Sequence, residues 1–344
     1  MSSVESTAAT TPFAGLRALA GCGGCAAKAP RDMVALLGQV AAAAGVGAEV
    51  LVGLTPCDDA AVYALDSERA LVATVDFFPP LVDDPDDYGA IAAANAVSDI
   101  YAMGGSVAFA LAVSGFPAVV PAAVIARVAG AAAAVVRQCG GSVLGGHSIR
   151  CEEPVFGLCV LGFVHPGRIW RKCGARAGDV LMLSKPVGTG LLVSANRPGP
   201  LTAAIASMKT TNRAAAAALQ ALARAPHAVT DVSGFGLVGH LEEMITQSGV
   251  SARLESDRVP LLAGALAAAQ AGARTSAHRQ ARASGSVLEF AGSVSQELQA
   301  LVTDPQTSGG LLAAVDAADV AALTSAGFAT IGTVSSGPAR LLVC

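Results

Sequence analysis

The chain has 344 residues, of which 53% are hydrophobic and only 14% are charged, with a formal net charge of −4. This length predicts two domains of roughly 150–200 residues each. The acidic balance excludes a nucleic-acid partner, whose phosphates require clustered Lys and Arg. A composition rich in Ala, Val and Leu and poor in aromatic residues favours layered α/β units and excludes disorder of the whole chain.

The N-terminal region and the most apolar stretch together predict where the protein resides. Residues 1–20 lack a basic segment followed by an apolar core, so we expect a flexible tail rather than a secretory signal. Residues 118–136 come closest to a membrane span, but Pro121 and Arg127 interrupt them and predict a buried helix with no membrane partner. Eight cysteines without a secretory signal are expected to be reduced thiols in the cytoplasm.

Apolar and β-branched runs alternate with helical patterns along the chain. In the first half we predict strands at 61–65, 70–76, 107–114 and 155–164, and helices near 86–103 and 121–138. The segment 165–178, rich in Gly and basic residues, breaks this pattern and places a boundary between domains 21–165 and 166–344. In the second half we predict a strand from 179, helices around 201–224, a strand at 227–231, a helix near 236–248, a polar stretch around 272–287 and an α/β segment from 296.

The acidic residues of the first half are few and stand near predicted strand ends. Asp58 and Asp59 lie in a Pro-containing loop directly before a strand, where a carboxylate pair can bind a hard cation or cap a turn. Asp76 ends an apolar strand, a common place for a ligand and also for an ordinary loop residue. Asn95 and Asp99 share one face of an apolar helix, which indicates either ligand binding or a solvated stripe.

Three glycine-containing segments accompany these acids. Residues 145–148, Gly-Gly-His-Ser after a short strand, can bind an anion or form a plain turn. Asp231 ends a predicted strand and precedes glycines that open a helix, and residues 303–312 repeat the pattern of Asp, Thr, Ser and paired Gly. A Walker-type phosphate loop, G-x-x-x-x-G-K-[ST], is missing from the sequence.

The segment GCGGCAAK, residues 21–28, places Cys22, Cys25 and Lys28 in a run of small residues. A zinc knuckle would need a second pair of ligands, which the sequence lacks. A dithiol redox pair, a nucleophilic thiolate whose pKa is lowered by Lys28 or a nearby cation, and two incidental thiols all stay open on these residues alone.

Taken in order, these segments resemble the selenide, water dikinase (selenophosphate synthetase) family over nearly the whole chain. The matching blocks are Cys25-x-x-Lys28, DDAAVY at 58–63, TVDFF at 74–78, ANAVSDIYAMGG at 94–105, GGHSI at 145–149, DVSGFGLVGH at 231–240 and DPQTSGGLL at 304–312. The family belongs to the aminoimidazole ribonucleotide synthetase-like superfamily. Its relatives share the fold and the acidic nucleotide site but lack the Cys-x-x-Lys motif.

The resemblance implies an α/β fold with two domains, an N-terminal one that forms a β-barrel in a homodimer and a C-terminal α/β sandwich. It also implies that ATP, selenide and water give selenophosphate, orthophosphate and AMP, with Mg²⁺ required. Selenoprotein synthesis or selenium-modified tRNA would use the product. Two other hypotheses remain: a same-fold kinase or synthetase that yields ADP without needing Cys25, and a thiol carrier of selenium or sulfur in which the aspartates are dispensable.

The resemblance also assigns roles by position. Cys25 and Lys28 match the catalytic pair, and Asp59, Asp99 and Asp231 match the magnesium ligands. The ATP contacts match Lys28, Pro56, Cys57, Asp58, Asp76, Asp99, Gly146, His147 and Ser148, the last three donated across the dimer in relatives. The chain departs from the family pattern in the alanines after Cys25, in the additional Cys22, and in Cys57, where a basic residue is common.

Overall fold

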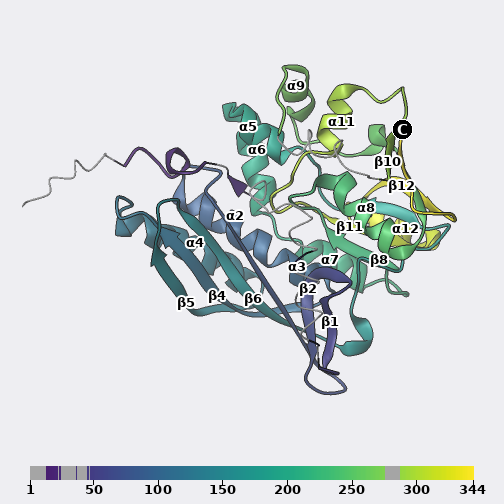
Figure 1. The fold of residues 1–344 in the computed structure, drawn as a ribbon, viewed down its shortest axis with the longest axis horizontal. Coiled ribbons are helices and arrows are strands. Elements are labelled where there is room, and N and C mark those ends of the chain that lie inside the picture. Colours follow the sequence, from purple (N-terminus) through teal and green to yellow (C-terminus); the bar gives the residue numbers. More distant parts are fainter. Residues whose placement is uncertain (1–12, 22, 25–35, 37–44, 46, 276–286) are drawn as a thin grey trace, which may run out of the picture.

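The protein is built on two β-sheets with helices between and around them (Figure 1). The structure, a computed structural model, describes residues 13–21, 23–24, 36, 45, 47–275 and 287–344. The mixed α/β class predicted from the sequence is confirmed by this arrangement.

The first sheet has six strands in the order β1-β2-β3-β6-β4-β5. Its strands are β1 (Val50–Leu54), β2 (Cys57–Ala64), β3 (Ala70–Phe78), β4 (Ser106–Phe116), β5 (Ser142–Arg150) and β6 (Val155–Val164). Neighbours are antiparallel except β4 and β5, which run parallel because helix α4 (Ala122–Gln138) connects them. The strands described in this one chain form an open sheet, so the barrel shared by two chains stays a prediction.

Two helices, α2 (Pro85–Ala96) and α3 (Ser98–Ala102), lie against the first sheet. Helix α2 begins at Asp84, whose side chain accepts hydrogen bonds from the amides of Asp86 and Asp87. Beyond its first turn the helix is buried on all sides, because it packs between the sheet, α4 and a helix of the second half. At Gly89 the contact with α4 is close: a Cβ there would lie 2.0 Å from the carbonyl oxygen of Val128.

Helix α4 corrects the expectation of a fully buried helix at 118–136. Its buried residues are Val128, Ala132, Val135 and Val136, and much of the rest of the helix is open to solvent. The alanine-rich pattern hid this amphipathic character, since Ala is tolerated on both faces. In the part of the chain that the structure describes, none of the helices has the length and hydropathy of a membrane span.

The second sheet has seven strands in the order β10-β13-β9-β12-β7-β11-β8. Its strands are β7 (Val180–Leu183), β8 (Ala228–Asp231), β9 (Ser251–Leu254), β10 (Leu288–Phe290), β11 (Leu311–Val315), β12 (Ala329–Ser335) and β13 (Leu341–Val343). The helices are α5 (Thr189–Ala195), α6 (Pro198–Lys209), α7 (Arg213–Gln220), α8 (Gly236–Ser248), α9 (Ala265–Gln270), α11 (Gln296–Val302) and α12 (Val320–Ser325). Short 3-10 turns are η1 (Arg17–Leu19), η3 (Pro166–Arg168), η4 (Ser256–Arg258) and η5 (Ala317–Asp319).

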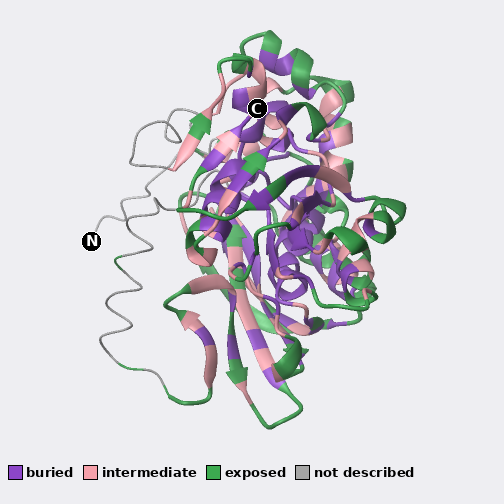
Figure 2. Ribbon diagram, turned by 90° about the vertical axis from the view of Figure 1, so that its right-hand side faces the viewer, coloured by how far each residue is buried: buried purple, intermediate pink, exposed green. Residues whose placement is uncertain are grey.

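The hydrophobic core is continuous between the two sheets. One cluster of buried side chains runs from the first sheet through α2 to α5, α6 and one face of the second sheet, and another fills the opposite face beneath α8. Buried residues accordingly gather in the middle of the molecule, whereas strands of the first sheet have long exposed or half-exposed stretches (Figure 2). Residues 13–20, expected to belong to a tail, pack here too: Leu16 is fully buried.

Candidate active site

The carboxylates singled out in the sequence lie on elements that contact one another where the two sheets meet. Asp59 is on β2, Asp76 on β3 and Asp99 on α3, while Asp231 ends β8 of the second sheet. Strands β2 and β3 are neighbours, α3 packs against both and against β8, and β2 also contacts β8. The fold therefore brings residues separated by more than 170 positions to one junction.

Asp76 and Asp99 are each held by a hydrogen bond from a neighbouring element. The Thr74 hydroxyl donates to Asp99 Oδ2 at 2.5 Å, and the Asn95 amide donates to Asp76 Oδ2 at 2.6 Å. The predicted single helix is interrupted at Val97, so Asn95 belongs to α2 and Asp99 to α3. Both carboxylates are thus oriented by neighbouring side chains: Asp99 is buried rather than on a solvated stripe, and Asp76 lies within β3 rather than in a loop.

Asp58 and Asp59 lie inside β2, not in the loop that the sequence predicted. Asp59 is 4% exposed, and its Oδ1 accepts from Lys172 Nζ at 3.0 Å and from the Thr230 hydroxyl at 2.9 Å. Asp58 accepts from the Lys172 backbone amide at 3.2 and 3.3 Å. Burial, and next the charge of Asp59, raise the pKa of Asp58 to about 6.

Lys172 is a buried cation among these acids. Burial alone lowers the pKa of a lysine, but Asp59 and Glu243 outweigh this effect and raise the pKa of Lys172 above its ordinary value. The Glu243 carboxylate lies 3.5 Å from its Nζ. The side chain is therefore an ammonium ion at neutral pH.

The carboxylates at the junction are of the ligand type that magnesium prefers, but in the described part of this structure they do not form a complete metal site. Among the described residues, no three His, Cys, Asp or Glu side chains form a group that could hold a metal ion. The buried Oδ2 of Asp59, however, has no hydrogen-bond partner in the described structure, and burial of an unpaired carboxylate oxygen is costly. Mg²⁺ takes oxygen ligands from one or two carboxylates together with phosphates and water. Asp59 Oδ2 is an oxygen of this kind, and the carboxylates of Asp99 and Asp231 have the same chemistry.

The segment 304–310 connects the second sheet to these carboxylates. The Ser308 amide donates to Asn95 Oδ1 at 2.8 Å, and Asn95 holds Asp76 through its other amide atom. Asn212 donates to the Gly309 carbonyl and to the Ser98 hydroxyl, both at 2.8 Å. These buried hydrogen bonds fix the position of α2 and α3 relative to the second sheet.

A second buried lysine supports the same segment. Lys185 Nζ donates to the carbonyl oxygens of Thr210 at 2.5 Å and Ser308 at 2.8 Å. Burial lowers the pKa of Lys185 to about 7, against the opposing charge of Asp231.

Gly146, His147 and Ser148 lie on β5, an edge strand, and not in the turn that the glycines suggested. Gly146 shares one cross-strand row with Asp76, through Leu158 and Ala112. Three interstrand spacings separate the two residues, which is about 14 Å. The same chain therefore does not bring this segment to its own carboxylates.

The segment leading to Cys25 begins at the junction of the two halves, whereas Cys22, Cys25 and Lys28 themselves lie outside the described residues. The Gly24 amide donates to the Pro79 carbonyl at 3.0 Å. Gly24 has φ +66°, and a Cβ there would lie 2.6 Å from the Thr307 hydroxyl, so only glycine fits this approach without a shift.

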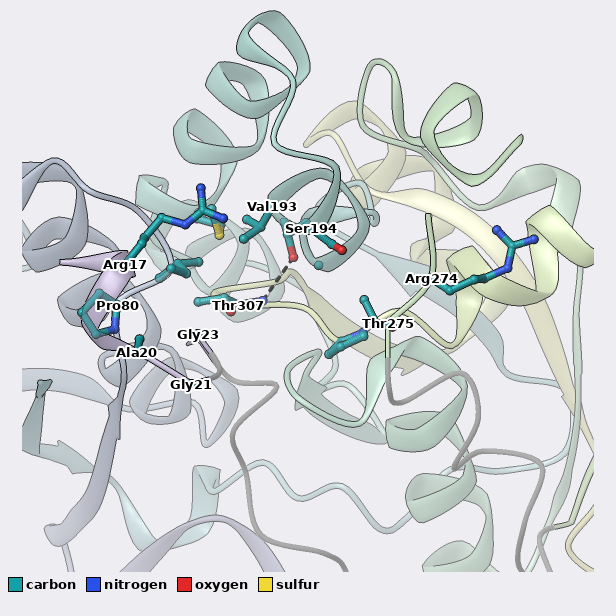
Figure 3. A pocket seen from close by; sticks show the side chains of 15 residues that line it. Arg17, Ala20, Gly21, Gly23, Pro80, Val193, Ser194, Arg274, Thr275 and Thr307 are labelled. Carbon is teal, nitrogen blue, oxygen red and sulfur yellow. Dashed lines mark hydrogen bonds between the residues drawn. The ribbon is translucent and has the colours of Figure 1, made fainter. Parts of the chain in front are cut away.

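A cavity of about 350 Å³ opens beside Gly21 and Gly23 (Figure 3). Its wall includes Thr307, whose amide donates to the Thr189 hydroxyl at 3.2 Å. The described glycines that precede Cys25 in the sequence therefore lie beside a cavity between the two halves.

Pro56 and Cys57, the remaining predicted nucleotide contacts, form the turn into β2 and its first residue, and Gln247 donates to the Cys57 carbonyl at 3.2 Å. Sequence reasoning missed Thr74, Lys172, Asn212, Thr230 and Ser308. The scarcity of lysine, four in 344 residues, was the one signal that pointed to Lys172.

Both domains of the chain match families of known proteins. Residues 57–164 match the N-terminal domain model of AIR synthase related proteins, and residues 176–341 match the C-terminal one. A solved hydrogenase maturation protein, HypE in complex with ATP, shares the fold with a TM-score of 0.63 at 18% identity, over 80% of this chain and 79% of that one.

Two curated relatives share more than 40% sequence identity with this chain. A selenide, water dikinase of Burkholderia ambifaria is 43% identical over 93% of this chain and 94% of its own length. One of Myxococcus xanthus is 41% identical over 94% of this chain and 95% of its own. The chain belongs to the selenide, water dikinase family.

Proposed function

We propose that this protein makes selenophosphate from selenide, water and ATP, releasing AMP and orthophosphate. The observation that carries the proposal is the meeting of Asp59, Asp76, Asp99 and Asp231 between the two sheets in a chain 43% identical to selenide, water dikinases. We assign the nucleotide and dimer contacts to residues 21–165 and the second α/β domain to 166–344. The six described cysteines are free thiols, which supports a cytoplasmic location.

In this proposal Asp59, Asp99 and Asp231 hold magnesium. A magnesium ion held by these residues would supply positive charge that neutralises and orients the phosphates of ATP. Asp58 and Asp76, with the turn at Pro56 and Cys57, contact the nucleotide. Thr74 and Asn95 keep their carboxylates in fixed orientations, because phosphoryl transfer depends mainly on positioning and charge stabilisation.

Cys25 and Lys28 complete the site from the segment that follows Gly24. The Cys25 thiolate holds the selenium donor, and the Lys28 ammonium meets negative charge that develops on the transferred phosphoryl group. The close packing of Gly23 and Gly24 against Pro80 and Thr307 supports this placement, since it starts the loop at the junction of the two halves.

The protein acts as a homodimer in this proposal. Val75 on β3, Phe163 on β6 and Leu111 on β4 are exposed apolar residues of the first sheet, as are Tyr63 and Phe77. By strand register they share one face of the sheet, and such a patch indicates a protein interface. The separation of Gly146, His147 and Ser148 from Asp76 supports their donation to the partner's site.

The test is phosphorus NMR of the protein with Mg-ATP and selenide under anaerobic conditions. We expect AMP, orthophosphate and selenophosphate from the parent and none from Cys25→Ala or Lys28→Ala. A final product of ADP with both variants matching the parent would overturn the dikinase assignment in favour of a same-fold kinase. No nucleotide turnover would favour a thiol carrier.

Asp99→Ala tests the metal assignment in the same assay. We expect AMP formation to fall by about 100-fold or more, because a charged ligand of the polyphosphate site is lost. Circular dichroism and thermal unfolding should match the parent, which separates loss of the site from loss of the fold. Full activity in a folded Asp99→Ala variant would remove Asp99 from the site.

A further inference from the structure

Lys172 is the one described lysine whose ammonium lies within 4 Å of a predicted magnesium ligand. Its Nζ is 3.0 Å from Asp59 Oδ1 and 3.5 Å from Glu243 Oε2, and the side chain is 6% exposed. Its backbone amide faces both carboxylate oxygens of Asp58. One residue thus contacts both acids of the Asp58-Asp59 pair.

Opposite charges meet in this cluster. Among the described residues, the Lys172 ammonium lies beside the carboxylates of Asp59 and Glu243, and its charge also acts on Asp58. His240 lies beyond Glu243, with Nδ1 3.9 Å from Oε2. The ammonium therefore offsets part of the negative charge that would draw a divalent cation to Asp59.

The two oxygens of Asp59 also differ. Oδ1 accepts from Lys172 and Thr230, while Oδ2 is buried without a hydrogen-bond partner in the described structure. The ammonium occupies one oxygen and fixes the orientation of the other, so Oδ2 is the oxygen of Asp59 that would be left for a metal ion.

We propose that Lys172 is a built-in counter-ion that weakens divalent-cation binding at Asp59 in the nucleotide-free protein. The inference rests on the proposed function. In that function an anionic nucleotide must approach a group of carboxylates, whose negative charge repels it. With part of the negative charge neutralised in advance, the site favours the cation that arrives with the triphosphate over a cation bound beforehand.

The test measures binding of Mn²⁺ to the nucleotide-free, full-length protein from the EPR signal of free Mn²⁺. Lys172→Met should tighten binding by about tenfold or more, because it removes one positive charge beside the metal ligand. Lys172→Arg keeps the charge and should stay close to the parent. Lys209→Met is the matched control, since it breaks a partly exposed lysine–carboxylate pair with Asp87, and it should leave Mn²⁺ affinity unchanged.

Unchanged affinity in a folded Lys172→Met variant would overturn the proposal and leave an ordinary ion pair. If that variant does not fold, Lys172→Gln gives the same comparison, since it removes the charge and keeps a donor. A folded Lys172→Met variant that binds no Mn²⁺, or that binds it equally well after Asp59→Asn is added, also overturns the proposal. AMP formation by the parent is scored separately, so failure of this inference and failure of the proposed function are distinguishable.

Discussion

Asp304 is a fully buried carboxylate that takes no part in the proposed chemistry. Its Oδ2 accepts from the Leu191 amide at 3.1 Å and from the Gln306 side chain at 3.0 Å. Burial nevertheless raises the pKa of Asp304 to about 7. Between about pH 4 and pH 7 the folded protein therefore keeps a proton that the unfolded chain has lost, so stability falls as pH rises through this window.

Asp304→Asn should remove that pH dependence, because the amide does not ionise. We expect the parent to lose about 3 kcal/mol of unfolding free energy between pH 5 and pH 8 from this residue, and the variant to lose none of it. Urea unfolding at the two pH values measures the difference. Asp257→Asn, at an exposed position, is the control and should follow the parent, whereas equal slopes for parent and Asp304→Asn would contradict the assignment.

At the scale of elements, the segment 304–310 depends on glycines that allow close approach. A Cβ at Gly309 would lie 2.1 Å from the carbonyl oxygen of Val232, next to Asp231. The Gly309 carbonyl also accepts the buried hydrogen bond from the Asn212 side chain. A larger side chain would therefore push this segment away from the carboxylate junction.

Gly309→Ala should lower the free energy of unfolding by about 1–3 kcal/mol. It should also lower AMP formation by a larger factor than the decrease in the fraction of folded protein. Gly130→Ala, in the exposed part of α4 with open space around it, should stabilise by about 0.5–1 kcal/mol with normal activity. Chemical denaturation and the nucleotide assay measure both. If the two variants have the same stability, the close approach at Gly309 does not constrain the fold.

Elements with a strong periodic pattern were predictable from the sequence, and those with turn-like residues were not. The strand at 155–164 and the helix at 236–248 coincide with β6 and α8. Strand β5 was underestimated, because its Gly-Gly-His-Ser run is typical of a turn when pairing with β4 is unknown. For the same reason Asp58 and Asp59 on β2 were assigned to a loop.

Asp76, Asp99 and Asp231 could be singled out because each lies in or at the end of an apolar run, and Asp58 and Asp59 because they form a carboxylate pair beside one. Their supporting residues could not be predicted, since a hydrogen bond such as that from the Ser308 amide to Asn95 spans 213 positions and leaves no local pattern. Lys172 lies in an irregular segment between the sheets, where sequence alone does not reveal which carboxylate it faces.

At the scale of the whole molecule, the exposed apolar face of the first sheet should decide the oligomeric state. Val75 and Leu111 lie in one cross-strand row, both paired with Cys159. The double variant Val75→Lys/Leu111→Lys should be monomeric by sedimentation velocity and should lose AMP formation, because unpaired charge opposes burial of this face and the partner's Gly146–Ser148 is lost. Leu266→Lys, an exposed apolar position on α9, should remain dimeric and active.

The buried hydrogen bonds from Asn212 to Ser98 and from Ser308 to Asn95 also have a thermodynamic consequence. The two sheets share one hydrophobic cluster, so melting either half would expose apolar surface of the other half to water and would break these hydrogen bonds. Scanning calorimetry should therefore record one endotherm whose van't Hoff and calorimetric enthalpies agree. Two separate endotherms would mean that the two halves unfold independently. The carboxylates at their junction would then separate at a lower temperature than that of complete unfolding.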